Sequence, residues 1–182
     1  MPRVFWVNSP HRAMSRAVMV LAMLTVAAFI LLMGPPSCTN ASKPRFGDSM
    51  LALQFARDVQ DVDWILGDAP SPDREVMRVK QYVDFGFIAF YTPLFLALSA
   101  MAIRKGGWRQ VTGIAAGICG VAAGVFDILE NRAILNLLDV PLRATSAAMI
   151  QAIRGPSTAK WVLAGVTVVL LSASLIRIPK TS

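Results

Sequence analysis

Four apolar stretches, each long enough to cross a lipid bilayer, constrain this chain more than any other feature of its sequence. They occupy about residues 17–33, 82–103, 111–131 and 158–178. A helix of about 20 apolar residues spans the hydrocarbon core, and the first stretch lies at the short end of the usable range. Backbone groups inside lipid must be hydrogen-bonded within their own segment, which favours helices. The sequence therefore predicts an all-α, polytopic membrane protein, with a four-transmembrane-helix bundle forming a single domain over residues 1–182.

The composition supports a membrane protein and argues against a nucleic-acid-binding one. Charged residues make up 16% of the chain and hydrophobic residues 55%, whereas soluble domains carry about 25% charged residues. The net charge is +7, but the basic residues flank the apolar stretches and do not form one basic face. We therefore expect the lipid bilayer as a partner, and no nucleic acid.

The chain lacks the residue sets that metal and cofactor chemistry usually requires. It has one histidine, His11, and two cysteines, Cys38 in a loop and Cys119 midway along an apolar stretch. These positions favour neither a disulfide nor a metal site, and we expect no cofactor. No phosphate-binding loop or Ser-His-Asp set is present. Catalysis, if there is any, would have to use carboxylates, Lys160 or Tyr91, so the sequence leaves open whether this is an enzyme.

Two polar segments separate the apolar stretches. Residues 34–81 form a long loop, in which residues 49–66 show helical periodicity with one apolar face, so we expect an amphipathic helix lying on the membrane or capping the bundle. After the third stretch, residues 143–154 resemble a short surface helix. The sequence Gly155-Pro156-Ser157 then predicts the start of a separate fourth helix.

Charge placement predicts the orientation in the membrane. Basic residues without acidic ones precede the first stretch, join the second to the third, and follow the fourth, whereas the loop at 34–81 holds six basic and seven acidic residues. By the positive-inside rule, both termini lie in the cytoplasm and the long loop lies outside. We expect a multi-pass protein of the inner (plasma) membrane. A cleaved signal peptide at 17–33 is the alternative for the first stretch.

Polar residues gather where three stretches approach the outer face. In the predicted topology, all five lie near one interface, beneath the amphipathic helix: Asp84, Asp127, Glu130, Asn131 and Lys160. The three on the third stretch share a helix face by their i, i+3 and i+4 spacing, and Lys160 is the expected counter-ion. Interfacial anchoring or a buried ion pair that fixes helix register explains this cluster. A polar pocket with a general acid or base, or a proton or cation site, explains it too.

Small residues on the third stretch predict close helix packing. They form two small-x-x-x-small pairs, which allow helix backbones to approach: Gly113, Gly117, Gly120 and Gly124. Packing within the bundle is favoured over a homodimer seam. Tyr91, seven residues after Asp84 on the same face, is expected to be a packing residue. The phenylalanines of the second stretch are expected to face lipid or fill the core.

Four short motifs together resemble a group of uncharacterised small bacterial four-helix membrane proteins. They are LALQFA at 51–56, YVDF at 82–85, FDILEN at 126–131 and AKW at 159–161. The resemblance implies an acidic residue opening the second span, D-x-x-E-N ending the third, and a Lys-aromatic pair opening the fourth. Gln54 departs from it, because the group would carry Glu there. The resemblance implies no substrate and no activity.

Three functions are therefore open. The first is a non-catalytic accessory or envelope-associated membrane protein with a membrane protein partner. The second is a protein or enzyme that binds a lipophilic ligand through the carboxylates and Lys160. The third, a proton-coupled or ion-conducting oligomer, is the weakest, because the sequence has no inverted repeat and no charge at mid-membrane.

Overall fold

The computed structural model describes residues 10–33 and 49–175, and within these ranges the chain is helical with no strand. Four helices are long and apolar enough to cross a membrane: α1 (Pro10–Met33), α4 (Pro72–Ile103), α5 (Trp108–Leu138) and α6 (Ala147–Leu175). Two short α-helices, α2 (Ser49–Gln54) and α3 (Val59–Leu66), and the 3₁₀ helix η2 (Leu142–Ala144) lie between them. The predicted all-α, polytopic four-helix class is confirmed.

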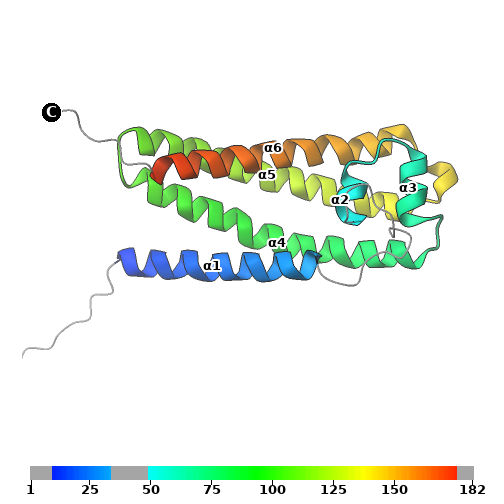
Figure 1. The fold of residues 1–182 in the computed structure, drawn as a ribbon, viewed down its shortest axis with the longest axis horizontal. Helices are drawn as coiled ribbons and strands as arrows, with labels where there is room; N and C mark the ends of the chain where they lie inside the picture. Colours follow the sequence, from blue (N-terminus) through cyan, green and yellow to red (C-terminus); the bar gives the residue numbers. More distant parts are fainter. Residues whose placement is uncertain (1–9, 34–48, 176–182) are drawn as a thin grey trace, which may run out of the picture.

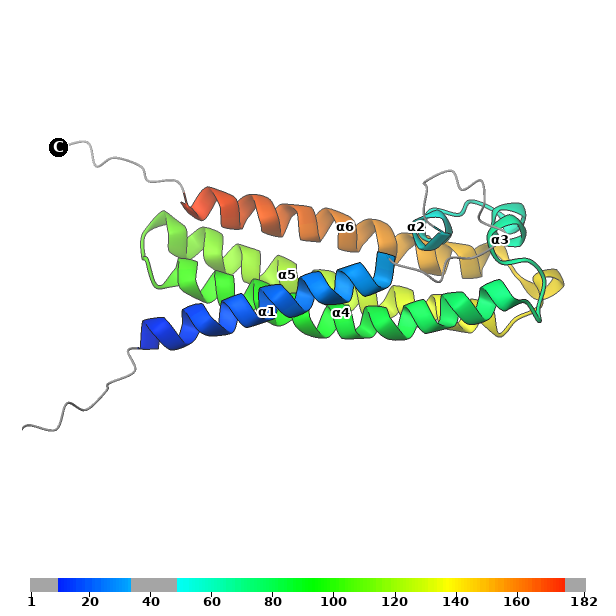
Figure 2. The ribbon, with the colours of Figure 1, turned by 60° about the horizontal axis from the view of Figure 1, so that its bottom comes forward.

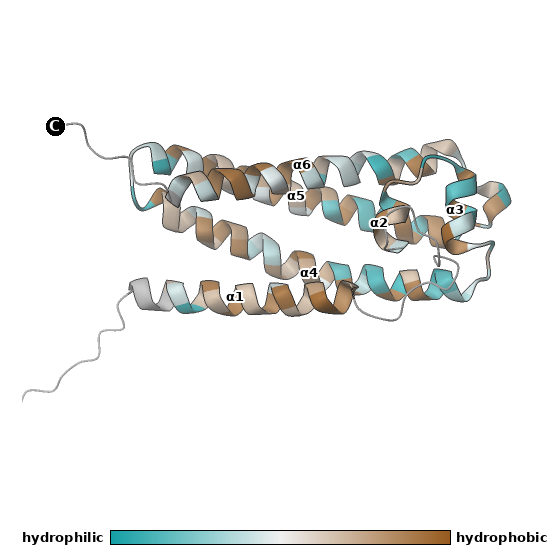
Figure 3. Cartoon of the chain, viewed as in Figure 1, coloured by the Kyte–Doolittle hydropathy of each residue, from teal (hydrophilic) through white to brown (hydrophobic). Residues whose placement is uncertain are grey.

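The helix α5 runs antiparallel to its two main neighbours α4 and α6, which run in the same direction, and α1 lies along α4 (Figures 1 and 2). At one end of the bundle, α2 and α3 cover the region where α4 begins, α5 ends and α6 begins; we call this the loop end. The opposite end holds the start of α1, the α4–α5 turn and the end of α6. Hydrophilic residues concentrate towards the loop end (Figure 3).

The helix α4 is longer than the predicted span, because it begins at Pro72 and not near residue 82. Ser71 caps it, accepting a hydrogen bond from the backbone N–H of Asp73 (3.2 Å), and Pro72 occupies the first turn, where its missing N–H is harmless. With 32 residues in α4 and 31 in α5, both helices approach about 48 Å, so they exceed the roughly 30 Å of hydrocarbon.

The prediction of a surface helix at 143–154 followed by a new helix at 158 is wrong. A single helix, α6, runs through Gly155 and Pro156 from Ala147 to Leu175. Pro156 removes one backbone donor, but nearby hydroxyl groups bind backbone carbonyls in the same turns: Ser157 Oγ donates to Ile153 O (2.8 Å) and Thr158 Oγ1 donates to Arg154 O (2.9 Å). Lys160 is therefore well inside a helix, away from the first turn where its charge would be disfavoured. The last predicted residues of this span, 176–178, lie outside the described residues.

The amphipathic helix predicted at 49–66 is two helices with a break between Gln54 and Val59. Asp58 adopts an extended backbone and caps α3, accepting a hydrogen bond from Asp61 N (2.9 Å). This capping competes with a continuous helix, as a short acidic side chain often does. The break turns α2 toward the α6 side of the bundle, while α3 lies at its tip (Figure 1).

A compact apolar core holds the loop end together. It combines residues of α2 and α3, such as Leu53 and Leu66, with Ile134 of α5 and Ile153 of α6, all almost fully buried. Arg74 of α4 is also buried (1% exposed), and its Nη1 donates to three carbonyls at the end of α5: Leu137 O, Leu138 O and Val140 O. A cation at a helix C-terminus is favourable, so Arg74 ties α4 to the end of α5.

A second tie connects the α3–α4 loop to η2 outside the membrane-spanning helices. The Asp68 carboxylate accepts hydrogen bonds from Leu142 N (2.7 Å) and Ala69 N (2.8 Å). These bonds favour the ionised form and lower the pKa of Asp68 from its usual value. Asp68 therefore holds the start of η2 more strongly when it is ionised than when it is protonated.

The predicted glycines lie between α5 and α4, within the bundle. A Cβ added at Gly120 would lie 2.9 Å from Phe95 Cβ, and one at Gly113 would lie 3.0 Å from Ile103 N. At Gly124 it would lie 2.5 Å from Thr92 Oγ1, whereas at Gly117 the nearest atom would be at an ordinary 3.5 Å. Three of the four glycines therefore permit a backbone approach that larger residues would prevent.

Candidate functional site

The centre of the site is a buried ion cluster that joins α5 to α6. Lys160 Nζ lies 2.6 Å from Asp127 Oδ1, and 3.0 and 2.9 Å from the two oxygens of Glu130. The side chains are almost inaccessible, at 8% exposure for Lys160, 5% for Asp127 and 0% for Glu130. Asp127 and Glu130 are three residues apart on α5, so one helix face presents both to the ammonium. Arg132, the other possible counter-ion, is exposed.

Two further polar contacts connect this cluster to α4. Tyr91 donates its hydroxyl hydrogen to Asp127 Oδ2 (3.0 Å), so both oxygens of Asp127 are engaged. Asn131 Nδ2 donates to Asp84 Oδ2 (2.7 Å). Asp84 and Tyr91 lie two helical turns apart on α4, and both are buried. The polar side chains of three helices therefore form one group inside the bundle.

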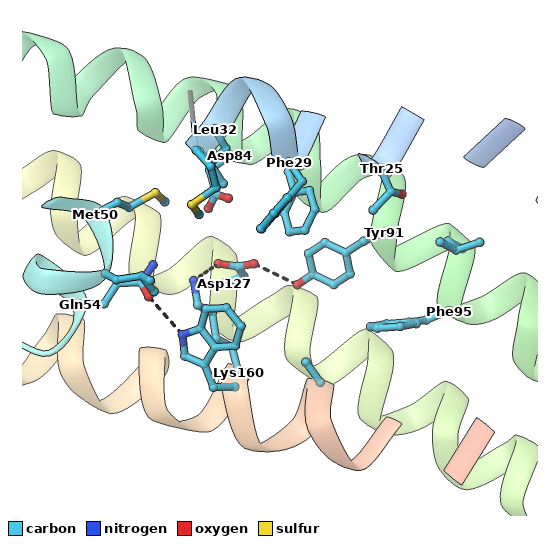
Figure 4. A pocket seen from close by; sticks show the side chains of 16 residues that line it. Thr25, Phe29, Leu32, Met50, Gln54, Asp84, Tyr91, Phe95, Asp127 and Lys160 are labelled. Carbon is cyan, nitrogen blue, oxygen red and sulfur yellow. Dashed lines mark hydrogen bonds and ion pairs between the residues drawn. The ribbon is translucent and has the colours of Figure 1, made fainter. Parts of the chain in front are cut away.

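A cavity of about 230 Å³ lies beside this group, between α1, α4 and α6, with α2 at one end. Its walls are mainly apolar, and its polar lining includes Asp84, Asp127 and Lys160. Figure 4 shows Asp84, Asp127 and Tyr91 directed toward the same space, with Met50 and Gln54 at one end and Phe95 at the other. An apolar cavity with a few convergent polar groups has the general form of a ligand-binding site.

The short helix α2 closes the cavity toward the loop end through one hydrogen bond to α6. Trp161 Nε1 donates to Gln54 Oε1 (3.1 Å), and both residues line the cavity. Met50 and Leu51, also from α2, line the same end. Gln54 stands where the resemblance implies Glu. It lines the cavity, and its neutral amide oxygen accepts the hydrogen bond from the Trp161 indole N–H.

The wall formed by α1 and α4 carries a continuous row of aromatic rings. The ring centroids of Phe29 and Phe87 are 6.0 Å apart, those of Phe87 and Tyr91 5.0 Å, and those of Tyr91 and Phe95 5.6 Å. All four residues line the cavity. The expectation that the phenylalanines of this span only face lipid or fill the core was too narrow, because Phe87 and Phe95 form part of this wall.

The structure brings together all five residues of the predicted cluster, although only three of them, Asp84, Asp127 and Lys160, line the cavity. Glu130 and Asn131 lie behind it, where Glu130 binds Lys160 and Asn131 donates a hydrogen bond to Asp84. Tyr91, which the sequence offered as a possible catalytic group but favoured as a packing residue, belongs to the site, and Gln54 was not predicted as a member of it. The signal for Tyr91 was its spacing of seven from Asp84, whereas the contact of Gln54 with Trp161 spans 107 positions in the sequence and left no local pattern.

The chemistry available at the site is acid–base and ionic. Counting each group in its usual state at neutral pH, three carboxylates face one ammonium. A buried carboxylate surplus requires a proton or a further cation to compensate it. The group can therefore hold a proton or receive a hydrogen-bond donor from the cavity.

No protein-family model, no curated protein and no solved structure matches this chain. The resemblance based on the D-x-x-E-N pattern therefore stays a prediction.

Proposed function

We propose that this protein binds a lipophilic molecule in the cavity between α1, α4 and α6, in the inner membrane, with both termini in the cytoplasm and the loop end outside. The observation that carries the proposal is the juxtaposition of an apolar cavity of about 230 Å³ with the buried carboxylates and ammonium of Asp84, Asp127 and Lys160. An ion cluster that served only to fix helix register would be stabilised by close apolar packing, and a cavity beside it adds nothing to that role.

The position of the cavity also supports a ligand that arrives from the bilayer. Its walls include α1, whose residues are largely exposed along the helix, with Phe29 46% exposed although it lines the cavity. A lipophilic molecule in the outer leaflet would reach the cavity between helices, and α2 would separate it from water. The basic turn at Arg104 and Lys105, at the opposite end of the bundle, supports the proposed orientation.

Filling the cavity tests this function without replacing a residue of the ion cluster. Ala164 of α6 lines the cavity, so Ala164→Phe places a large side chain in it. Val162, on the same helix, is 59% exposed, so Val162→Phe makes a similar change toward lipid. Native mass spectrometry of each protein, extracted gently from its own membrane, should find a discrete bound small molecule on the wild type and on Val162→Phe. It should be absent from folded Ala164→Phe.

The same experiment distinguishes the accessory function expected from the sequence. If no small molecule accompanies the wild type, or if identical adducts remain on Ala164→Phe, the cavity does not bind a ligand. A partner protein that copurifies in stoichiometric amount with the wild type and with both variants would then assign this chain as an accessory subunit.

A further inference from the structure

We infer that the ligand of this cavity is a lipophilic amine with a small head, whose ammonium group binds Asp84 while its hydrocarbon chain follows the aromatic wall. This inference rests on the proposed function, because it assumes that the cavity binds a lipophilic molecule and names the chemistry of its head.

The distribution of charge around the cavity favours a cationic head. Among the described residues that line it, Lys160 is the one cation, and its ammonium is already bound to Asp127 and Glu130. Asp127 is further satisfied by the Tyr91 hydroxyl. Asp84 is the carboxylate of the lining that Lys160 does not bind, so a cationic head has a partner there and an anionic head would meet a carboxylate surplus.

Asp84 also has hydrogen-bonding capacity left for a ligand. This residue is 98% buried (2% exposed), and the hydrogen bond it receives in the described part of the chain comes from Asn131 to Oδ2. Asp84 lines the cavity, and Figure 4 shows its carboxylate directed into that space. One carboxylate oxygen therefore faces the cavity without a hydrogen bond from the described residues. A charged hydrogen bond from a ligand N–H would satisfy it.

The small space around the carboxylates limits the size of the head. Asp84 and Asp127 present little surface to the cavity, at 2% and 4% exposure, and apolar side chains surround them. A primary ammonium can approach a carboxylate oxygen to hydrogen-bond distance, whereas a trimethylammonium cannot donate a hydrogen bond and needs more room. The aromatic row from Phe29 to Phe95 then offers an apolar path for the chain, leading away from the loop end.

The test compares amphiphiles that share one chain and differ in the head. Dodecylamine, dodecanol, dodecanoate and dodecyltrimethylammonium are titrated separately into the purified protein in maltoside micelles, and occupancy is followed by native mass spectrometry. Dodecylamine should bind at least about tenfold more tightly than the other three, since a charge-assisted hydrogen bond contributes more than a neutral one.

Two variants assign the preference to Asp84. In Asp84→Asn the amine should bind no more tightly than the alcohol. The variant can keep its contact with Asn131, whose Oδ1 has no partner in the described structure and can accept from the new amide. Asp139→Asn is the matched control, because Asp139 is an exposed carboxylate that pairs with Arg78 at the end of α5. It should retain the full preference of the wild type.

Other results would contradict the head chemistry, the head size or the proposed function separately. If the wild type binds dodecanol or dodecanoate as tightly as the amine, the inference about the head is wrong while the proposed function stands. Equal binding of dodecyltrimethylammonium overturns the small head. If none of the four binds and Ala164→Phe also changes nothing, the proposed function fails as well. The wild-type comparison is decisive even where Asp84→Asn does not fold.

Discussion

At the scale of single residues, Lys160 is the group on which the site depends. Its ammonium contacts Asp127 and Glu130 and is almost fully buried. A buried ion pair adds little net stability compared with apolar packing, but removing one partner leaves the other charged group without compensation. We therefore expect a single substitution in the cluster to lower the stability of the protein, and a combined substitution that neutralises all partners to restore most of it.

Lys160→Met keeps the length of the side chain and removes its charge. We expect the free energy of unfolding to fall by about 3–5 kcal/mol, because two buried carboxylates lose their cation. The triple variant Lys160→Met/Asp127→Asn/Glu130→Gln should recover most of this loss. Thermal unfolding in detergent, followed by circular dichroism, measures both. A Lys160→Met protein as stable as the wild type would show that the carboxylates are compensated from elsewhere.

The residue scale also shows where sequence reasoning reaches its limit. Helical spacing was enough to place Asp127, Glu130 and Asn131 on one face, and the topology brought Lys160 and Asp84 to the same level of the bundle. The roles of Tyr91 and Gln54 depend on how α4 and α2 pack against α5 and α6. That packing involves contacts between residues far apart in the chain, which periodicity within one segment does not report.

At the scale of elements, the interface between α4 and α5 is set by glycines that differ in the space around them. Gly120 and Gly117 lie one turn apart on α5, yet an added Cβ would meet Phe95 Cβ at 2.9 Å in the first case and Ser99 Cβ at 3.5 Å in the second. Phe95 Cβ is fixed to the α4 backbone, so it cannot move away without moving the helix.

Gly120→Ala should therefore lower the free energy of unfolding by about 1–3 kcal/mol, as overpacking usually does. Gly117→Ala should leave stability unchanged or slightly raised, since it also reduces the freedom of the unfolded chain. Thermal unfolding of the two alanine variants, measured side by side, checks this difference. Equal effects of the two substitutions would mean that α4 and α5 are not as close as described.

Element boundaries were the least predictable part of the fold. The four apolar stretches each correspond to a helix, but α4 and α6 begin about ten residues before the apolar stretches that predicted them. Their extra turns are stabilised by the core of the loop end and by Arg74, so tertiary contacts outweigh the Gly155-Pro156 signal. The break between α2 and α3 has a local cause, the Asp58 cap. It was not predicted, because the apolar periodicity continues through residues 49–66 as it would in one helix.

At the scale of the whole molecule, the orientation in the membrane decides which compartment the loop end faces. Asp63 of α3 and Lys105 of the α4–α5 turn are both exposed and lie at opposite ends of the bundle. Single cysteines at these positions, in a protein whose Cys38 and Cys119 are replaced by serine, report the two faces independently.

In intact cells, a membrane-impermeant maleimide should label Asp63→Cys and should not label Lys105→Cys until the membrane is opened. The physical reason is the excess of basic residues on the short segments at the α4–α5 end, which favours retention in the cytoplasm. The reverse labelling pattern would place the cavity at the inner leaflet, where its ligand would come from a different pool of lipids.

The loop-end core has a consequence for the order in which the chain is made. Leu53 and Leu66 leave the ribosome before Ile134 and Ile153, against which they pack. Since domains assemble as synthesis proceeds, the contacts of α2 and α3 with α6 can form only after α6 has been made. The walls of the cavity, which include Lys160, Trp161 and Ala164 of α6, are therefore complete only at that late stage.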